Sequence, residues 1–161
     1  MWVKFRSLTQ AVSGEHNENP IFWSHTDLTS GDFNRYSIGI YSGNIAGYFI
    51  AGNVLQGSYT TAWEPSLDTW YHIAVVRSSV TTPKALIFVD GVSKPVTEVV
   101  SLADKDLVNI NGEVWIGTLW YTPSGETPSA KYPVNGWIDE FRFSKGIARW
   151  TNDFTKPTVP Y

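Results

Sequence analysis

The chain has 161 residues, a length typical of one domain that buries about two-thirds of its unfolded surface. Its net charge of −3 argues against a surface that binds the phosphate backbone of nucleic acid. The absence of cysteine excludes disulfides, thiolate metal sites and cysteine nucleophiles. No apolar run approaches the length of a membrane-spanning helix.

Strand patterns dominate the sequence from its first residues. Aromatic residues make up 15% of the chain, which favours strands and also suits the recognition of sugar or protein surfaces. Alternating or continuous apolar stretches predict strands at 1–5, 21–25, 36–41, 46–52, 71–78, 85–91, 113–118 and 136–144.

Turn residues separate these stretches. Ser42-Gly43-Asn44 predicts one hairpin turn, with Gly and Asn supplying positive φ, and Asp90-Gly91 predicts a second turn of type I′. Only residues 145–150, after a possible N-cap at Ser144, suggest a short helical turn. The pattern therefore predicts an all-β antiparallel sandwich or jelly roll, organised as a single domain over 1–161 with an extended tail at 154–161.

The order of several motifs resembles a known superfamily. WYHIAVVRSS, ALIFVDGV, VWIGT and NGWIDEFRFSKGIARWTNDFTKPTVPY follow one another in the chain. Together with the initial MWVKFRS, they resemble the laminin-G-like domains of the concanavalin A-like lectin/glucanase superfamily. The ending is most similar to modules of bacteriophage structural proteins such as tail and fibre components. The resemblance implies a concanavalin A-like jelly roll and an extracellular or virion-associated location.

The resemblance also implies an incomplete beginning. Family members usually carry several dozen residues before the strand that MWVKFRS resembles, and these supply the first strands and part of a frequent calcium site. We therefore expect a domain that lacks the usual first strands, either because it is cropped at the N-terminus or because another subunit completes it. An open sheet edge favours such pairing, including a homo-oligomer.

The carboxylates of the final motif do not predict an enzyme. Glycosidases of this fold use Glu-x-Asp-x-Glu, which aligns three carboxylates on one strand face. Here the positions two residues either side of Asp139 are Trp137 and Phe141, and Glu140 points to the opposite face. The three histidines show no metal-binding spacing, and His72 is expected to be a packed strand residue. We therefore predict a non-catalytic module.

Asp139 nevertheless raises a separate question. The alternation places it on one face with Trp137, Phe141 and Phe143, where an unpaired carboxylate is costly. Three alternatives remain open: a structural Ca²⁺, as the resemblance implies for the matching Asp, an ion pair with Arg149, or hydrogen bonds from backbone amides.

Two loops combine aromatic rings with polar groups, as sugar binding requires. The candidate ligand-binding residues are Tyr59, Trp63, Glu64 and Asp68 in 56–69, and Trp120, Tyr121, Glu126 and Tyr132 in 118–133. Core packing or protein contact is the alternative role for these aromatic residues. Five other residues are assigned to the core: Trp70, Trp115, Ile87, Val89 and Phe143. The sequence thus predicts a lectin-like module that binds a cell-surface or extracellular glycan within an adhesion assembly. The alternative is a structural virion module that makes only protein contacts, and neither reading involves nucleic acid or membrane insertion.

Overall fold

The computed structural model describes residues 1–8, 20–27, 34–77, 84–102, 107–121, 127 and 129–158. Within these ranges the regular structure is entirely β, as the sequence predicts. The strands are β1 (Trp2–Ser7), β2 (Ile21–Asp27), β3 (Asn34–Tyr41), β4 (Asn44–Ala51), β5 (Val54–Ala62), β6 (Trp70–Arg77), β7 (Ala85–Val89), β8 (Val92–Lys94), β9 (Thr97–Val100), β10 (Glu113–Ile116), β11 (Leu119–Tyr121), β12 (Ser129–Lys131) and β13 (Asn135–Asp139).

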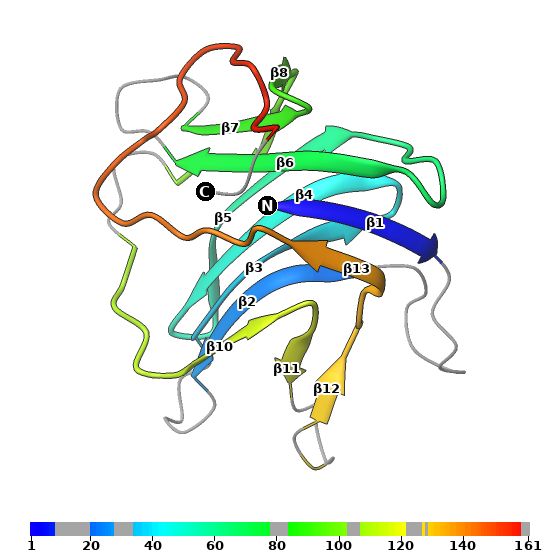
Figure 1. Ribbon diagram of the computed structural model, residues 1–161. Helices are drawn as coiled ribbons and strands as arrows, with labels where there is room; N and C mark the ends of the chain where they lie inside the picture. The colour runs from blue at the N-terminus through cyan, green and yellow to red at the C-terminus, as the bar shows by residue number, and fades with distance from the viewer. Residues whose placement is uncertain are drawn as a thin grey trace.

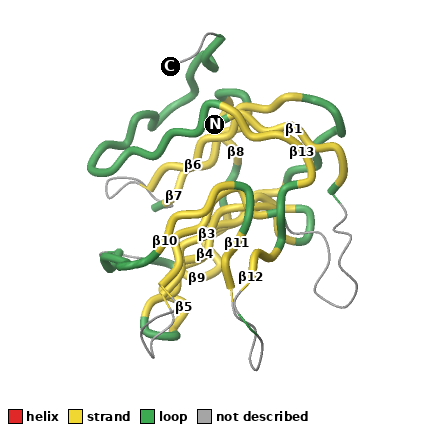
Figure 2. Tube along the Cα trace, turned by 60° about the horizontal axis from the view of Figure 1, so that its bottom comes forward, coloured by secondary structure: helices red, strands yellow, loops and turns green. Residues whose placement is uncertain are grey.

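Two antiparallel sheets form a sandwich. Sheet A has the order β13-β1-β6-β7-β8 and sheet B the order β10-β2-β3-β4-β5-β9, while β11 and β12 form a separate hairpin beside β2. Figures 1 and 2 show the sheets as two layers. β1, the first strand of the chain, is paired on both sides, with β13 and with β6. The predicted fold class, an all-β antiparallel sandwich, is therefore confirmed.

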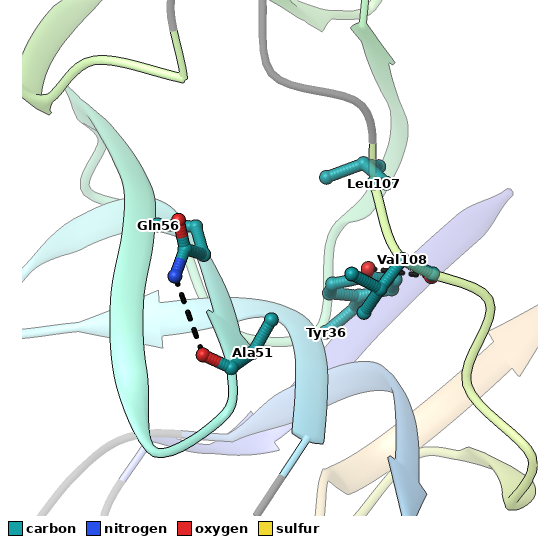
Figure 3. A pocket seen from close by; sticks show the side chains of 5 residues that line it. All are labelled: Tyr36, Ala51, Gln56, Leu107 and Val108. Atoms are coloured by element: carbon teal, nitrogen blue, oxygen red, sulfur yellow. Dashed lines mark hydrogen bonds between the residues drawn. The ribbon is translucent and has the colours of Figure 1, made fainter.

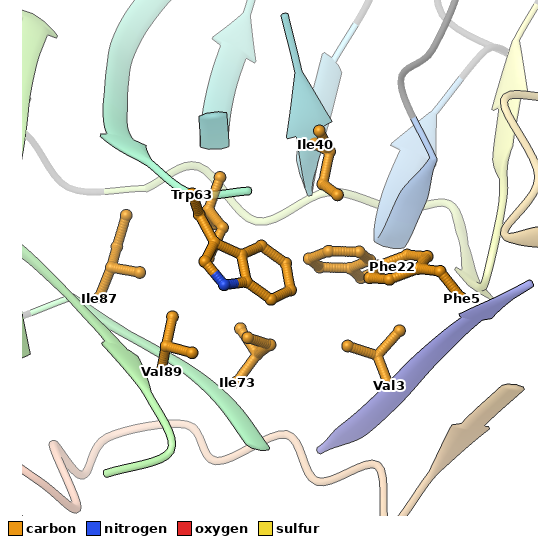
Figure 4. Packing of buried hydrophobic residues seen from close by; sticks show 9 residues of the cluster. Val3, Phe5, Phe22, Ile40, Trp63, Ile73, Ile87 and Val89 are labelled. Carbon is orange, nitrogen blue, oxygen red and sulfur yellow. The ribbon is translucent and has the colours of Figure 1, made fainter. Parts of the chain in front are cut away.

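The main core lies between the two sheets. Sheet A contributes Val3, Phe5, Ile73, Ile87 and Val89, and sheet B contributes Phe22, Ile40 and Ile45, all at most 6% exposed. Trp63, from the loop after β5, lies among them (Figure 4). Burial of each such side chain stabilises the fold by roughly 1.5–3 kcal/mol, so this cluster is the main force holding the layers together.

The Asp90-Gly91 turn also anchors the C-terminal segment. Both residues have positive φ, 53° and 81°, as a type I′ turn between β7 and β8 requires. The N–H of Phe154 donates to the Gly91 carbonyl at 2.9 Å, and the N–H of Ser93 donates to Asp153 Oδ1 at 2.8 Å. A Cβ at position 91 would lie only 1.9 Å from the Phe154 carbonyl oxygen. Glycine is therefore required here by both conformation and space.

The C-terminal segment covers part of the outer face of sheet A. Trp150 and Phe154 pack over Ala74 and Phe88, and their rings stack on each other at 4.2 Å. Both rings also meet His72 edge-on, at 5.9 and 5.7 Å. Figure 2 shows this segment on the side of sheet A that faces away from sheet B. The predicted tail thus lies on the body of the domain as far as residue 158, the last one described.

Several local predictions are wrong. The hairpin between β3 and β4 does turn at 42–44, but the positive φ angles belong to Ser42 and Gly43 rather than to Asn44. The last strand ends at Asp139, because Glu140 has a φ of 50°, and residues 145–150 form bends rather than a helical turn. Residues 56–62, predicted as part of the loop 56–69, belong instead to the long strand β5.

Candidate functional site

The first predicted ligand loop does not present its aromatic residues to solvent. Tyr59 lies within β5 at 1% exposure, and its hydroxyl accepts a hydrogen bond from the Leu102 N–H at 3.1 Å. Trp63 is 9% exposed and meets Phe5 and Tyr71 edge-on within the core. The structure therefore contradicts sugar stacking by these two rings. Both are core residues, the alternative that the sequence left open.

The carboxylates of this loop are exposed. Glu64 and Asp68 lie between β5 and β6, and Asp68 has a φ of 55°. The N–H of Asp68 donates to the Phe5 carbonyl at 2.7 Å, which ties the loop to the end of β1. Their side chains are open to solvent, but the predicted aromatic platform beside them does not exist.

The second predicted loop contains the β11–β12 hairpin and does bring aromatic residues together. The rings of Trp120 on β11 and Trp115 on β10 are stacked, with centroids 4.8 Å apart and planes inclined by only 7°. Tyr121 follows on β11, and Tyr132 lies just after β12 with a φ of 54°. Glu126 lies outside the described residues. Trp115, assigned to the core from sequence, is instead half-buried on an edge strand.

Strand register places these rings over the outer face of sheet B. Trp115 pairs with Ser24, Ser24 with Ser37, and Ser37 with Tyr48, so all four side chains lie in one row on one face. The Ser24 hydroxyl donates to the Thr118 carbonyl at 3.0 Å, which links the hairpin to that row. Small serine side chains between larger aromatic ones leave room for the hairpin to lie against the sheet.

Arg35 lies in the next row of the same face. Its guanidinium is 5.8 Å from the ring centroid of Tyr121. Burial lowers the pKa of Arg35, while the neighbouring Tyr121, Tyr132 and Tyr48 act in the opposite direction. A buried guanidinium with three phenols around it provides several donors within an aromatic surface. The surface formed by Arg35, Tyr48, Trp115, Trp120, Tyr121 and Tyr132 is called the hairpin face below.

The buried polar atoms at this surface include two donors that make no hydrogen bond within the described part of the chain. They are Oγ1 of Thr26, a residue only 4% exposed, and Nε1 of Trp115. Thr26 pairs directly with Arg35 across β2 and β3 and therefore shares its face. Leaving such a group unsatisfied costs about 1–3 kcal/mol. Both atoms can donate to oxygen acceptors, which makes the hairpin face a candidate for a ligand rich in oxygen.

Asp139 is not on a buried aromatic face, contrary to the prediction. It is exposed at the end of β13, and its Oδ1 accepts the N–H of Glu140 at 2.8 Å. Phe143 is 64% exposed and stacks on Trp23 beyond the end of the strand. The guanidinium of Arg149 donates from Nε to the Ser144 hydroxyl at 2.7 Å. A backbone amide thus satisfies the carboxylate, one of the three alternatives.

A calcium role for Asp139 stays a prediction from the resemblance. Among the residues that the structure describes, no group of three or more His, Asp or Glu side chains is placed to hold a metal ion. One exposed carboxylate supplies too few oxygen ligands for Ca²⁺, which takes about six to eight.

A cavity of about 160 Å³ lies on the opposite side of sheet B from the hairpin face. It is lined by Tyr36, Ala51, Gln56, Leu107 and Val108 (Figure 3). The Tyr36 hydroxyl donates to the Val108 carbonyl at 2.7 Å, and Gln56 Nε2 donates to the Ala51 carbonyl at 3.3 Å. These polar groups already have partners within the protein, so the cavity is a weaker candidate than the hairpin face.

Sequence reasoning missed Arg35, Tyr48 and Thr26 as site residues. Alternation along β3 places Arg35 and Ser37 on one face and the buried Tyr36 on the other. That pattern was visible in the sequence, but only the register of β2, β3 and β4 joins these residues to the hairpin.

Comparison with known proteins gives one match. The model of the family described as the concanavalin A-like lectin/glucanases superfamily matches residues 1–149. No curated protein and no solved structure gives a significant match. Among the described residues there is no helix of the length and hydropathy needed to cross a membrane.

Proposed function

Because the chain belongs to the concanavalin A-like lectin/glucanase superfamily, we propose that it is a non-catalytic carbohydrate-recognition module whose ligand binds at the hairpin face. We further propose that it acts in an extracellular or virion-associated adhesion assembly, such as a phage tail or fibre, which the likeness of its final motif supports. Its partners would then be a cell-surface glycan and the other subunits of that assembly.

One observation carries the proposal: at the stacked Trp115–Trp120 pair, two buried donors make no hydrogen bond to any described residue. Thr26 Oγ1 and Trp115 Nε1 can each bind a hydroxyl oxygen, and Trp115 stacks on Trp120. Sugars combine an apolar C–H face with a rim of hydroxyls, so they match an aromatic surface with hydrogen-bond donors beside it. Any ordinary apolar ligand would leave both donors unsatisfied.

The binding mechanism is stacking combined with hydrogen bonding. Trp120 and Tyr121 would cover the C–H face of a sugar, and Arg35 and Thr26 would bind its oxygens. Each contact of this kind contributes about 0.5–1.5 kcal/mol, so a single site is weak. Several copies in one assembly would raise the overall affinity through effective concentration.

The composition of the hairpin face supports a role without catalysis. The six side chains that define it are aromatic or cationic, and the strand register adds Glu113, which pairs with Thr26, to the same face. Retaining glycoside hydrolysis requires two carboxyl groups about 5 Å apart across the scissile bond.

A glycan array with neutral sugars, with and without EDTA, tests the proposal. Trp120→Ala and Thr26→Val should each abolish detectable binding, whereas Phe143→Ala, an exposed aromatic residue elsewhere, should leave it unchanged. Loss of binding in EDTA would add Ca²⁺ to the site. If no neutral glycan binds the wild-type protein, or if Thr26→Val binds as the wild type does, the hairpin face is not the sugar site.

A second candidate function is a structural module that makes only protein contacts. The apolar side chains of edge strand β10 favour it: Val114 and Ile116 are 55% and 51% exposed, and Phe143 is also exposed. Sedimentation of the wild type and of Ile116→Glu separates the two functions. A dimer that the substitution dissociates, together with an empty glycan array, would favour the structural role.

A further inference from the structure

The outer face of sheet A carries a row of tryptophan and lysine side chains. Lys4 on β1 pairs with Trp137 on β13 and with Trp70 on β6, so the three side chains lie next to one another across three strands. Both tryptophans are substantially exposed, Trp137 at 41% and Trp70 at 38%. Two exposed tryptophans side by side on one sheet face form an apolar surface of the kind that marks a binding site more often than single exposed residues do.

The cations of this row are held by the indole rings. Lys4 Nζ lies 4.3 Å from the ring centroid of Trp137 and 5.4 Å from that of Trp70. The guanidinium of Arg6 lies 4.9 Å from the Trp137 centroid. Because both cations lie so close to the same ring, their charges are less than about 10 Å apart. Lys4, Arg6, Trp70 and Trp137 are called the Trp–Lys patch below.

Neither charge has a paired carboxylate within the part of the chain that the structure describes. Among the described residues, neither Lys4 nor Arg6 forms an ion pair or a hydrogen bond. The nearest carboxylate along β13, that of Asp139, lies one row away and already accepts the N–H of Glu140. Two neighbouring cations with no ion pair among the described residues give this part of the surface a local positive charge, although the chain as a whole carries a net charge of −3.

The patch occupies the part of sheet A that the C-terminal segment leaves open. Trp150 and Phe154 cover the face over β6 and β7, and contact His72. The Trp–Lys patch lies over β13, β1 and the first residue of β6. The C-terminal segment shows that aromatic side chains pack on this face, and the uncovered part adds the positive charges of Lys4 and Arg6.

We propose that the Trp–Lys patch is a second binding site, which takes an acidic polysaccharide carrying carboxylate or sulfate groups. Lys4 and Arg6 bind anionic groups on successive sugars, and the exposed indoles contact the apolar sugar faces. The site lies on the opposite sheet from the hairpin face and does not depend on the function proposed there. A membrane surface fits less well, because attachment to anionic lipid usually needs a cluster of about four to eight basic residues.

Polygalacturonate is the probe, because every sugar carries a carboxylate, and its methyl-esterified form is the matched neutral polymer. We expect calorimetry at low salt to show binding of the acid form that added salt weakens. The double variant Lys4→Gln/Arg6→Gln should bind the acid form at least about tenfold more weakly than the wild type. The loss of one charge-assisted hydrogen bond already corresponds to about a tenfold change in affinity. The single variant Arg6→Gln, at an exposed position, should show part of the loss with an unchanged melting temperature.

The control Lys94→Gln/Lys145→Gln removes the same charge elsewhere on the surface and should bind as the wild type does. Trp120→Ala should also leave this binding unchanged, which separates the patch from the hairpin face. The proposal is overturned if the wild type does not bind the acid form, if the esterified form binds equally, or if the control loses as much as the patch variant. Tighter binding of polyglutamate or of phosphatidylserine vesicles would overturn it in favour of an acidic protein or a membrane.

Discussion

Acid should destabilise this domain through one buried histidine. His72 on β6 has no exposed surface, and its ring meets Trp2, Trp150 and Phe154 edge-on at 5.3 to 5.9 Å. Burial lowers the pKa of His72 from 6.5 to about 4, and the nearby amino group of Met1 also lowers it. Asp90 acts in the opposite direction, and Lys156, paired with Asp90 at 3.2 Å, lowers the pKa slightly.

The sign of the effect follows from proton binding. Between pH 6.5 and about 4 the unfolded chain binds a proton at His72 that the folded protein does not, so the free energy of unfolding falls as the pH falls. The contribution of His72 is complete above pH 6.5 and is lost as the pH falls towards 4. The difference between the two pKa values, about 2.5 units at about 1.4 kcal/mol each, limits the total loss to about 3.5 kcal/mol.

Urea unfolding followed by tryptophan fluorescence at pH 7 and pH 4.5 measures this loss. At pH 4.5 the wild type should have lost about 2.5 kcal/mol through His72, in addition to any loss from carboxylates. His72→Leu keeps an apolar side chain in the aromatic cage and removes the titrating imidazole, so it reports the contribution of the other groups, namely the carboxylates and the Met1 amino group, whose pKa burial lowers to about 6. If wild type and variant lose the same free energy between the two pH values, His72 is not held neutral by the fold and the reasoning is refuted.

Three further changes test the packing. Gly91→Ala should lower the free energy of unfolding by about 2–4 kcal/mol, because the new Cβ would clash with the Phe154 carbonyl. Gly43→Ala is the control, since Gly43 also has a positive φ but lies in open space, and it should cost about 1 kcal/mol. Equal melting temperatures for the two variants would contradict the proposed clash. Trp63→Ala should cost about 3–5 kcal/mol in urea unfolding, since it empties the centre of the core, and a loss below 1 kcal/mol would place the ring at the surface. Thr26→Val should leave the melting temperature unchanged or raise it, because the buried hydroxyl has no partner among the described residues, and a clear decrease would reveal a structural hydrogen bond there.

The sequence by itself determined the class of fold and much of the strand content. Alternation of apolar residues locates β2, β3, β6 and β7 to within a few residues, because a strand with one buried face must show it with period two. The Asp90-Gly91 pair predicts its turn because few other residues adopt positive φ at both positions. The sequence also singled out 118–133 as a candidate ligand loop, since its aromatic residues have no place in a regular core pattern, and its binding role stays a prediction.

Residue composition led to a wrong secondary-structure prediction where small polar residues form a strand. The stretch Gly57-Ser58-Tyr59-Thr60-Thr61 has the composition of a loop, yet it pairs with β4 along its length. Tyr59 and Thr61 face the interior of the sandwich from there. At the end of β13, the positive φ of Glu140 stops an alternation that otherwise continues in the sequence through Phe143.

Only the tertiary structure decided which faces are covered and which residues become neighbours across strands. Alternation shows that Trp137 and Asp139 share a face, but not that this face points to solvent. The pairing of β1 with both β13 and β6 places Lys4 between two tryptophans that are 67 positions apart in the chain (137 and 70). The register of β10, β2 and β3 likewise joins Trp115, Thr26 and Arg35. The physical reason is that strand alternation is a local property of the backbone, whereas pairing and layer packing depend on the whole chain.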